Sequence, residues 1–235
     1  MGMDSDMDLD LDTVEHLIQR LGSESTHERE NAAIDLGLAR DARAVEPLIQ
    51  TLKNDLEGSV RGNAARALGE IGNTRAVDAL IDALSDPEEY VQDQAIHALG
   101  EIGDARAADP LAGIIRQDNR HRWAATHALG QIGDTGSVAP LLKALGDKDF
   151  RDQHGHDLRW RAAEALGLIG DERSVKPLIK ALKDKDWHLR EAAAAGLGEM
   201  KYEGAVKPLT EALQDENQAV RDAVKKALER IELGS

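Results

Sequence analysis

The chain has 235 residues, of which 41% are hydrophobic and only 3% aromatic, and its formal net charge at pH 7 is −15. So negative a charge argues against general binding of nucleic acids or anionic membranes, because both favour a basic surface. The sequence contains no cysteine, which excludes disulfide, thiolate and Cys-ligated metal chemistry. No apolar run approaches the length of a membrane span and no signal peptide is evident, so we expect a cytoplasmic protein.

The N-terminal segment is strongly acidic. Residues 1–12 contain no Lys or Arg but five aspartates, which are Asp4, Asp6, Asp8, Asp10 and Asp12. This composition predicts an acidic, disordered tail over residues 1–12. Apolar residues then recur at helical spacing at Val14, Leu17, Ile18 and Leu21. This amphipathic helix has no partner helix in its own unit, so we expect it to cap a repeat array.

The rest of the chain repeats itself. The glycine of a recurring Leu-Gly pair marks the period, with steps of 32, 31, 30, 37 and 31 residues between Gly37, Gly69, Gly100, Gly130, Gly167 and Gly198. Periods in this range are typical of solenoids, propellers and arrays. Because the apolar residues inside each unit have helical spacing, a helical solenoid is the prediction.

Each unit is predicted to contain two helices, illustrated by residues 60–71 and 77–84. A Gly-Asx pair between them, here Gly72 and Asn73, ends the first helix and caps the second. Prolines mark the first turn of the second helix in five units, at Pro47, Pro110, Pro140, Pro177 and Pro208. Six pairs ending near Gln214, the capping helix and a last helix over residues 217–233 predict fourteen helices in one solenoid over residues 13–233.

The register breaks once, where six extra residues lie within 146–157, GDKDFRDQHGHD. An insertion in a repeat falls in a loop, often on the binding side of the array. This segment contains Phe150, the only phenylalanine of the chain. We therefore expect the insert to be a mobile lid, with Phe150 covering the binding groove.

The repeated pattern, a VRxxAAxALGxIG helix followed by GDxRAVxPLIxAL, resembles the short HEAT-like repeats of the phycobilisome-lyase (PBS lyase) class over residues 26–231. Residues 166–187 are also similar to artificial alpha-helical repeat scaffolds derived from this class. The resemblance implies a right-handed all-α solenoid of about six two-helix repeats of ~31 residues, whose members mostly bind other proteins.

Two enzymatic branches of this class can be compared with the chain. Bilin lyases attach tetrapyrroles to phycobiliproteins, but no residue here is a signature for bilin. Deoxyhypusine hydroxylase holds two irons between repeated His-Glu pairs. In this sequence His27-Glu28 is the single His-Glu dipeptide, and it precedes the position of that motif. The resemblance therefore does not predict an iron site.

One side of each first helix, opposite its apolar stripe, is predicted to be exposed. Slots four residues apart, such as Gly58, Gly62, Arg66 and Glu70, share this side, and in the related artificial scaffolds it forms the concave binding surface. All three tryptophans fall there in consecutive units. The candidate partner-binding residues are Trp123, Trp160, Trp187, Tyr90, Arg120, His97, His127, Arg161, His188 and, from the insert, Phe150. Aromatic residues and arginine are the usual interface anchors, although the tryptophans could instead pack over neighbouring helices.

A further slot carries arginine in six units, with Gln92 as the exception: Arg29, Arg61, Arg122, Arg159, Arg190 and Arg221. These arginines could form an anion-binding ladder. They recur, however, irrespective of what the exposed face contains. We therefore favour a structural role, in which they pair with Asp or carbonyl groups at neighbouring turns.

Metal binding and catalysis have little support. His154, His156 and Asp157 of the insert offer ligands, but His-Gly-His-Asp in a loop is a weak metal signal. No nucleophile is paired with a base, and no phosphate-binding loop is present. We predict a non-enzymatic protein-binding scaffold without a cofactor, whose acidic rim steers a basic or mixed-charge protein or peptide segment into the groove. The alternative is a lyase-like or metal-dependent enzyme with its site under residues 146–157.

Overall fold

A computed structural model describes residues 11–117 and 120–233 of the chain. Within these ranges the protein contains fourteen α-helices and six short 3-10 helices but no β-strand, which confirms the predicted all-α class and helix number. The predicted acidic tail lies outside the described residues, apart from Leu11 and Asp12, which begin the first helix.

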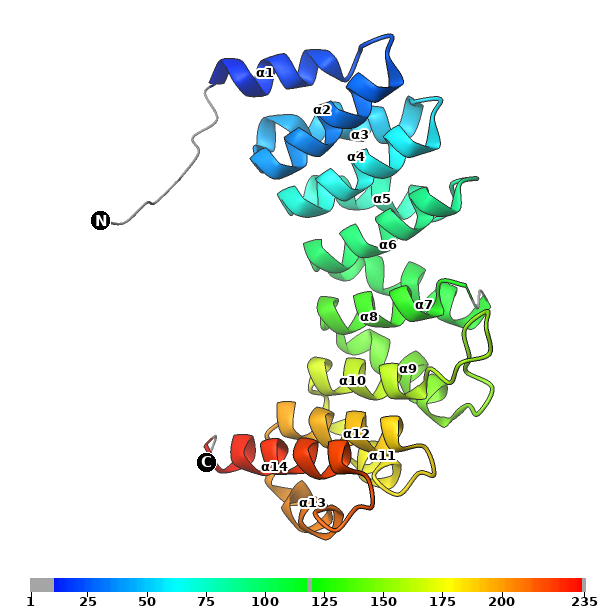
Figure 1. The fold of residues 1–235 in the computed structure, drawn as a ribbon, viewed down its shortest axis with the longest axis vertical. Coiled ribbons are helices and arrows are strands. Elements are labelled where there is room, and N and C mark those ends of the chain that lie inside the picture. Colours follow the sequence, from blue (N-terminus) through cyan, green and yellow to red (C-terminus); the bar gives the residue numbers. More distant parts are fainter. Residues whose placement is uncertain (1–10, 118–119, 234–235) are drawn as a thin grey trace, which may run out of the picture. The chain divides into compact units, whose positions relative to one another are not determined.

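The chain forms two compact units, residues 1–102 and 103–235. The first unit contains α1 (Leu11–Arg20), α2 (Thr26–Ala39), α3 (Val45–Asn54), α4 (Gly58–Ile71), α5 (Val77–Ala83) and α6 (Glu89–Ile102) (Figure 1). The second contains α7 (Ala108–Gln117), α8 (Arg122–Ile132), α9 (Val138–Gly146), α10 (Arg159–Ile169), α11 (Val175–Ala181), α12 (Trp187–Glu199), α13 (Val206–Ala212) and α14 (Gln218–Glu232).

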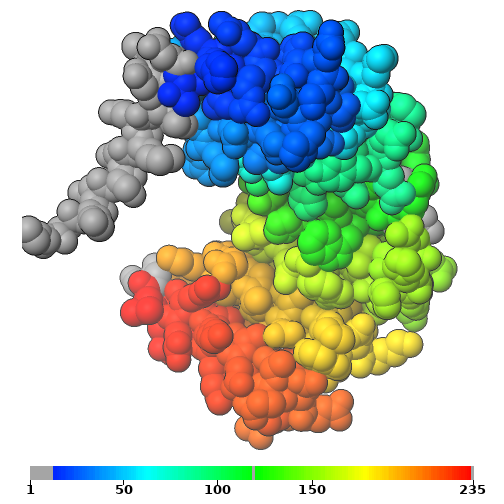
Figure 2. All heavy atoms as spheres, turned by 45° about the horizontal axis from the view of Figure 1, so that its top comes forward, coloured from blue at the N-terminus to red at the C-terminus, as the bar shows by residue number. Residues whose placement is uncertain are grey.

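Each unit has two layers of helices. In the first unit α2, α4 and α6 pack successively, and in the second α8, α10, α12 and α14 do the same. The intervening helices pack against this layer, for example α3 on α4 and α9 on α10. Leucine, isoleucine, valine and alanine fill the core between the layers. In the space-filling view, consecutive segments within each unit lie against one another (Figure 2).

The repeat turns follow the predicted chemistry. Gly72 ends α4 in the left-handed region with φ 72°, and the side chain of Asn73 accepts a hydrogen bond from the backbone N–H of Arg75. The capped element is first a 3-10 turn, Thr74–Ala76, which leads directly into α5. The Gly-Asx pair therefore does both of its predicted tasks.

Within each unit, glycines of the Leu-Gly pairs allow neighbouring first helices to approach closely. A methyl group added at Gly167 of α10 would overlap the Cα of Gly196 in α12. At Gly198 it would lie 2.7 Å from the Cα of Ala227 in α14. Because real Cβ atoms cannot come so near to backbone, glycine at this slot is what sets the spacing of the first-helix layer.

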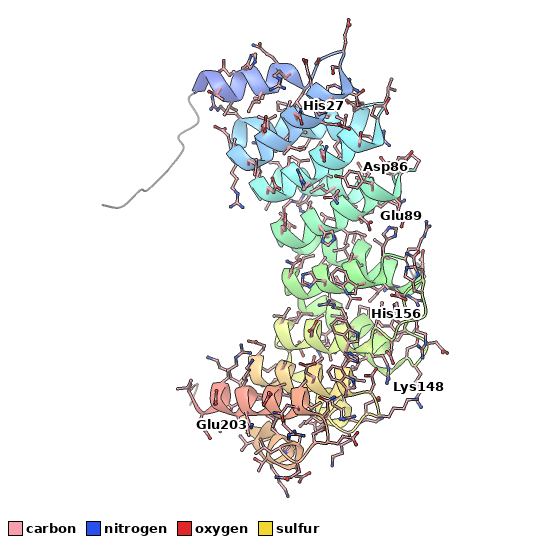
Figure 3. The ribbon with its side chains drawn as sticks, viewed as in Figure 1. His27, Asp86, Glu89, Lys148, His156 and Glu203 are labelled. Atoms are coloured by element: carbon pink, nitrogen blue, oxygen red, sulfur yellow. The ribbon has the colours of Figure 1, made fainter. Side chains whose placement is uncertain are left out.

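The arginine ladder is structural, as predicted. Arg29 donates to Asp55, Arg61 to Asp86, and Arg190 to Asp215, with Nε to carboxylate distances of 2.7, 2.8 and 2.7 Å. Each of these arginines also donates to two backbone carbonyls at the preceding turn. Asp86 at such a turn is labelled in Figure 3. At these three positions the ladder thus joins the first helix to the turns on both of its sides.

Acidification should weaken this ladder. Although burial opposes the shift, the arginine and backbone hydrogen bonds lower the pKa of Asp55, Asp86 and Asp184, and the Arg190 hydrogen bond lowers that of Asp215. Because the folded-state pKa values lie below the unfolded ones, their stabilisation is complete above about pH 4 and is lost as pH falls through the folded values.

We therefore expect the free energy of unfolding, measured by urea denaturation, to drop by on the order of a few kcal/mol between neutral pH and about pH 2. The Asp215→Asn variant serves as the control, since one of its ladder carboxylates cannot titrate, and it should lose less. Equal losses in the two proteins would contradict this role of the ladder.

The insert forms a loop between α9 and α10 that contains its own backbone hydrogen bonds. Arg151 and Asp157 make an isolated β-bridge, and the N–H of Leu158 donates to the carbonyl of Phe150 at 2.9 Å. Phe150 is only 3% exposed, and the Arg122 guanidinium at the start of α8 lies 5.4 Å from its ring centre. The prediction that Phe150 covers the binding groove is therefore wrong: as the one aromatic residue of the loop, it is buried as the loop's anchor.

Candidate functional site

The exposed side of the first-helix layer in the second unit is hollowed. One hollow of about 400 Å³ lies over α10, α12 and α14, and a second of about 310 Å³ reaches from α8 over α10 to α12. Both are lined by Glu164 and Ala195. We treat them as one surface, called here the first-helix groove.

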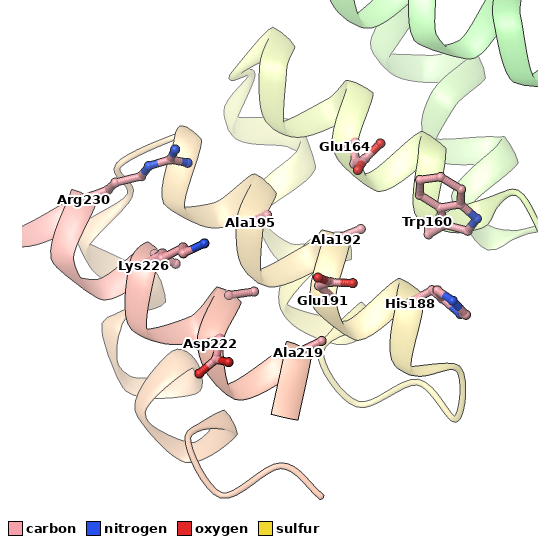
Figure 4. Close-up of a pocket in the computed structure, with 12 residues that line it drawn as sticks. Trp160, Glu164, His188, Glu191, Ala192, Ala195, Ala219, Asp222, Lys226 and Arg230 are labelled. Carbon is pink, nitrogen blue, oxygen red and sulfur yellow. The ribbon is translucent and has the colours of Figure 1, made fainter. Parts of the chain in front are cut away.

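Small residues form the floor of this groove, and larger side chains stand around it. The floor of the larger hollow is alanine, at Ala192, Ala195, Ala219 and Ala223. Figure 4 shows Trp160 and Glu164 projecting from α10, Glu191 from α12, and Lys226 from α14. The same small residues that let the helices pack closely thus leave space above them.

Two tryptophans and an arginine form a stack that reaches from the groove to its edge. The guanidinium carbon of Arg161 lies 4.5 Å from the ring centre of Trp123 and 4.2 Å from that of Trp160. Arg161 also donates to Glu164 at 2.7 Å. Cation–π contacts of this kind contribute about 0.5–2 kcal/mol each. The stack therefore fixes side chains of α8 and α10 to one another.

Glu164 is the titratable group that the groove perturbs most clearly. Burial raises its pKa above the usual range, Arg161 opposes this rise, and the carboxylate of Glu191 adds to it. Asp222 of α14 also lines this hollow, and the two acidic side chains Glu164 and Glu191 face it beside Trp160. A positively charged group placed between them would be attracted by both.

Trp123 and Trp187 stand at the edge of the groove, each against a histidine. Trp123 is 40% exposed and stacks on His127 with ring centres 5.9 Å apart. Trp187 is 37% exposed and stacks on His188 at 3.7 Å. The histidines line the hollows, whereas neither Trp123 nor Trp187 does so. Of the predicted residues, the structure brings Trp160, Arg161, His127 and His188 into the groove itself.

Three predicted residues lie elsewhere. Tyr90 and His97 are exposed on α6 of the first unit, where Tyr90 lies over Gly62 and donates a hydrogen bond to Asn63 at 2.9 Å. Gly62, predicted to be exposed, is buried beneath Tyr90, and a methyl group there would collide with the Tyr90 ring. Arg120 is exposed just before α8 and lines neither hollow.

Sequence analysis did not include several lining residues among its candidates. These are Glu164, Leu168, Glu191, Glu199, Lys226 and Arg230. The signal was present in the slot of Glu70, one turn beyond that of Arg66, where Leu168 replaces a polar residue. Leu168 is 55% exposed. The signal is not specific to the groove, however, because this slot is acidic at Glu70, Glu101 and Glu199 but holds an exposed leucine again at Leu38.

The insert does not assemble a metal site. Both oxygens of Asp157 accept hydrogen bonds from Arg159, and Nδ1 of His156 lies 2.8 Å from Asp152. The rings of His154 and His156 are 6.0 Å apart, and His156 projects from the long loop (Figure 3). The hollow beside Phe150 measures only about 100 Å³. His154, His156 and Asp157 therefore do not converge on a common ligand position.

Over the ranges that the structure describes, none of the helices combines the length and the apolar character needed to cross a bilayer. Two curated relatives are similar to part of the chain. Phycocyanobilin lyase subunit alpha of Picosynechococcus sp. is 40% identical over 79 residues, and that of Microchaete diplosiphon is 43% identical over 89 residues. The matches cover 30% and 34% of this chain, and 30% of the length of each relative.

Solved structures resemble the whole chain. The CpcE–CpcF complex of phycocyanin lyase from Nostoc sp. contains a chain that aligns with a TM-score of 0.59 at 25% identity, covering 99% of this chain and 97% of that one. Importin beta aligns with a TM-score of 0.57 at 18% identity over 92% of this chain and 35% of its own length, a likeness of fold.

The sequence family described as HEAT repeats matches in four overlapping stretches, residues 14–88, 45–121, 77–156 and 150–229. Together these stretches include every helix pair and most of the terminal helices. The helix pairs, the capped turns between them and the close glycine contacts of the first-helix layer agree with this match. The chain is therefore a HEAT-repeat protein, an α-solenoid of the family whose pattern it carries from end to end.

Proposed function

We propose that this protein is a non-enzymatic scaffold that binds a protein or peptide segment in the first-helix groove. Helical-repeat scaffolds are a fold typical of protein binding. The observation that carries the proposal is the groove of the second unit, where Trp160 and Arg161 occupy slots at which the repeat itself requires no large side chain. Large residues on an alanine floor suit the anchors and pockets of an interface.

Binding in such a groove requires little further ordering of its side chains. Arg161 already clamps Trp123 and Trp160 in place, and the floor belongs to tightly packed helices. A partner would therefore meet side chains in fixed positions, which lowers the entropy lost on association. The edge tryptophans, with 40% and 37% of their surfaces exposed, offer further apolar area to the same partner.

The charges of the groove favour a segment of mixed charge with a basic residue near Trp160. Glu164 and Glu191 lie at that end, whereas Lys226 and Arg230 project from α14 at the other (Figure 4). Arg230 forms an ion pair with Glu199. Of these two α14 cations, Lys226 is therefore the one without an ion-pair partner among the described residues. The net charge of −15 adds long-range attraction for a basic partner.

The test is retention of partners by the protein and by a Trp123→Ala, Trp160→Ala double variant, identified by mass spectrometry after capture from source cells. We expect the double variant to lose at least about tenfold in affinity for a retained partner, since buried aromatic anchors contribute about 2 kcal/mol or more.

The matched control is Tyr202→Ala, which removes a 41% exposed aromatic residue outside the groove. It should leave binding unchanged. Circular dichroism must show that all variants remain folded. Equal retention by the double variant and the control would mean that the tryptophans serve only packing.

A second candidate function, a role in bilin transfer, rests on the relatives named phycocyanobilin lyase subunit alpha. Because the chain spans 30% of those relatives' length in the matches, the activity is a proposal for this chain. Titration with phycocyanobilin tests it. Saturable change in the pigment's absorbance that the Trp123→Ala, Trp160→Ala variant abolishes would favour this function over a purely protein-binding one.

A further inference from the structure

A second groove lies among the second helices of the second unit, between α9 and α11. Its volume is about 730 Å³. The hollow is lined by residues of α9 and the loop after it, of α11 and the turn after it, and of the starts of α10 and α12. The floor is apolar and consists of Leu142, Leu145, Pro177, Ala181 and Leu189.

Four lysines surround this floor, and we call the hollow the lysine-rimmed groove. Lys176, Lys180 and Lys183 come from α11 and the turn after it, and Lys148 extends from the loop that follows α9 (Figure 3). In a chain with a net charge of −15, these four lysines, together with Arg159, make a local reversal of the overall charge.

The repeat fold does not require these lysines. The slots of Lys176 and Lys180 hold Glu46 and Gln50 in α3, and Asp78 and Asp82 in α5. The helices at those positions form equally well with acidic or neutral residues. Single lysines occupy these slots elsewhere, at Lys143 in α9 and Lys207 in α13, but α11 is the described second helix that carries lysine at both.

Their arrangement costs stability in the free protein. Lys176 and Lys180 are four residues apart on one helix, where like charges repel. Lys176 also lies in the first turn of α11, where the helix dipole favours an acidic residue. Among the described residues only Lys183 of the four has an ion-pair partner, Glu211 at 3.7 Å. The one carboxylate lining the groove, Asp184, is already bound by Arg159.

We propose that the lysine-rimmed groove is a second docking surface, which binds an acidic peptide segment whose apolar side chains enter the leucine floor. Carboxylates of the segment pair with Lys148, Lys176 and Lys180, and relieve the repulsion between the two helical lysines. A bare phosphate would leave the apolar floor unfilled, and a nucleic acid would be repelled by the acidic surface beyond the groove. This surface is independent of the first-helix groove and of opposite charge.

The probe is a fluorescein-labelled peptide in which Glu and Leu alternate, and the measurement is fluorescence anisotropy with the full chain. We expect saturable binding that the Lys176→Glu, Lys180→Glu double variant weakens by at least about tenfold, because two attractive contacts become repulsive. This variant should fold normally, since α5 carries Asp78 and Asp82 at the same slots.

The matched control is Lys53→Glu, Lys207→Glu, which changes the net charge equally at two exposed lysines outside the groove. It should bind the peptide within about twofold of the original chain, and so should the Trp123→Ala, Trp160→Ala variant. A peptide of alternating Glu and Ser should bind more weakly. The proposals for the first-helix groove and for the lysine-rimmed groove can thus be contradicted independently.

Three results would overturn the proposal: absence of saturable binding, equal weakening by the control variant, or equal affinity for the Glu-Ser peptide. The first would show that the groove does not bind an acidic, apolar peptide. The second would show that the weakening reflects the net charge of the protein and not the two lysines of the groove. The third would describe a simple anion site. Displacement of the peptide by a short RNA at similar concentration would assign the surface to nucleic acid instead.

Discussion

Replacing Arg190 with alanine should lower the free energy of unfolding by about 3–5 kcal/mol, the size of effect measured when one partner of a buried ion pair is removed. Arg190 is 7% exposed. It donates to both carboxylate oxygens of Asp215 and to the carbonyls of Asp184 and Lys185. The substitution removes the arginine donors of a carboxylate and of two carbonyls at once. Lysine could not replace arginine here, because it lacks the planar guanidinium that donates to all of them. Urea denaturation followed by circular dichroism measures the loss.

The control for Arg190 is Arg43→Ala. Arg43 makes an equally short contact with Asp41, at 2.7 Å, but this pair is exposed and local in sequence. In water such a pair stabilises little, so the variant should behave like the original chain. If the two substitutions had similar effects, the ladder would not hold neighbouring repeats together.

A methyl group at Gly167 should also be strongly destabilising, by about 3 kcal/mol or more. Overpacking a tight core costs about 1–3 kcal/mol when side chains can adjust. Here the added carbon would overlap the Cα of Gly196, which is backbone and cannot rotate away. The Gly167→Ala variant must therefore move α10 from α12, beneath the first-helix groove.

Gly113→Ala supplies the comparison for this effect. Gly113 also lies inside a helix, α7, but an added methyl there meets nothing nearer than a guanidinium nitrogen of Arg116 at 4.0 Å. Alanine favours helix over glycine by about 0.5–1 kcal/mol. We therefore expect opposite signs for the two substitutions in the same denaturation experiment. A stabilising Gly167→Ala would show that the two helices do not approach as closely as described.

The fold could be predicted from the sequence because every level of the pattern agrees. The Leu-Gly period, the Gly-Asx turns and the prolines of the second helices each mark the same boundaries, and the structure confirms fourteen helices within the described ranges. The structural role of the arginine slot was also predicted, since recurrence irrespective of the exposed face indicates a contact internal to the repeat. Arg190 with Asp215 shows that contact directly.

The site was less predictable, because spacing assigns a residue to a face but does not determine its neighbours. Trp160 and Arg161 are adjacent in sequence, yet only the structure places Trp123 on the other side of the same guanidinium. The prediction for Phe150 was wrong because the insert has no repeat pattern from which burial could be inferred. The burial of Phe150 involves a tertiary contact with Arg122. Lys176 and Lys180 lie on a second helix, α11, and were not predicted because the tryptophans of the sequence all lie on first helices.

Photo-cross-linking tests the binding function of the first-helix groove most directly. A benzophenone side chain would be introduced at Glu191, which faces the larger hollow, and separately at Tyr202 outside it. After irradiation with source-cell lysate, we predict one protein partner joined at Glu191, absent at Tyr202 and lost in the Trp123→Ala, Trp160→Ala background. Equal cross-links at both positions, or cross-links at Tyr202 alone, would contradict the account.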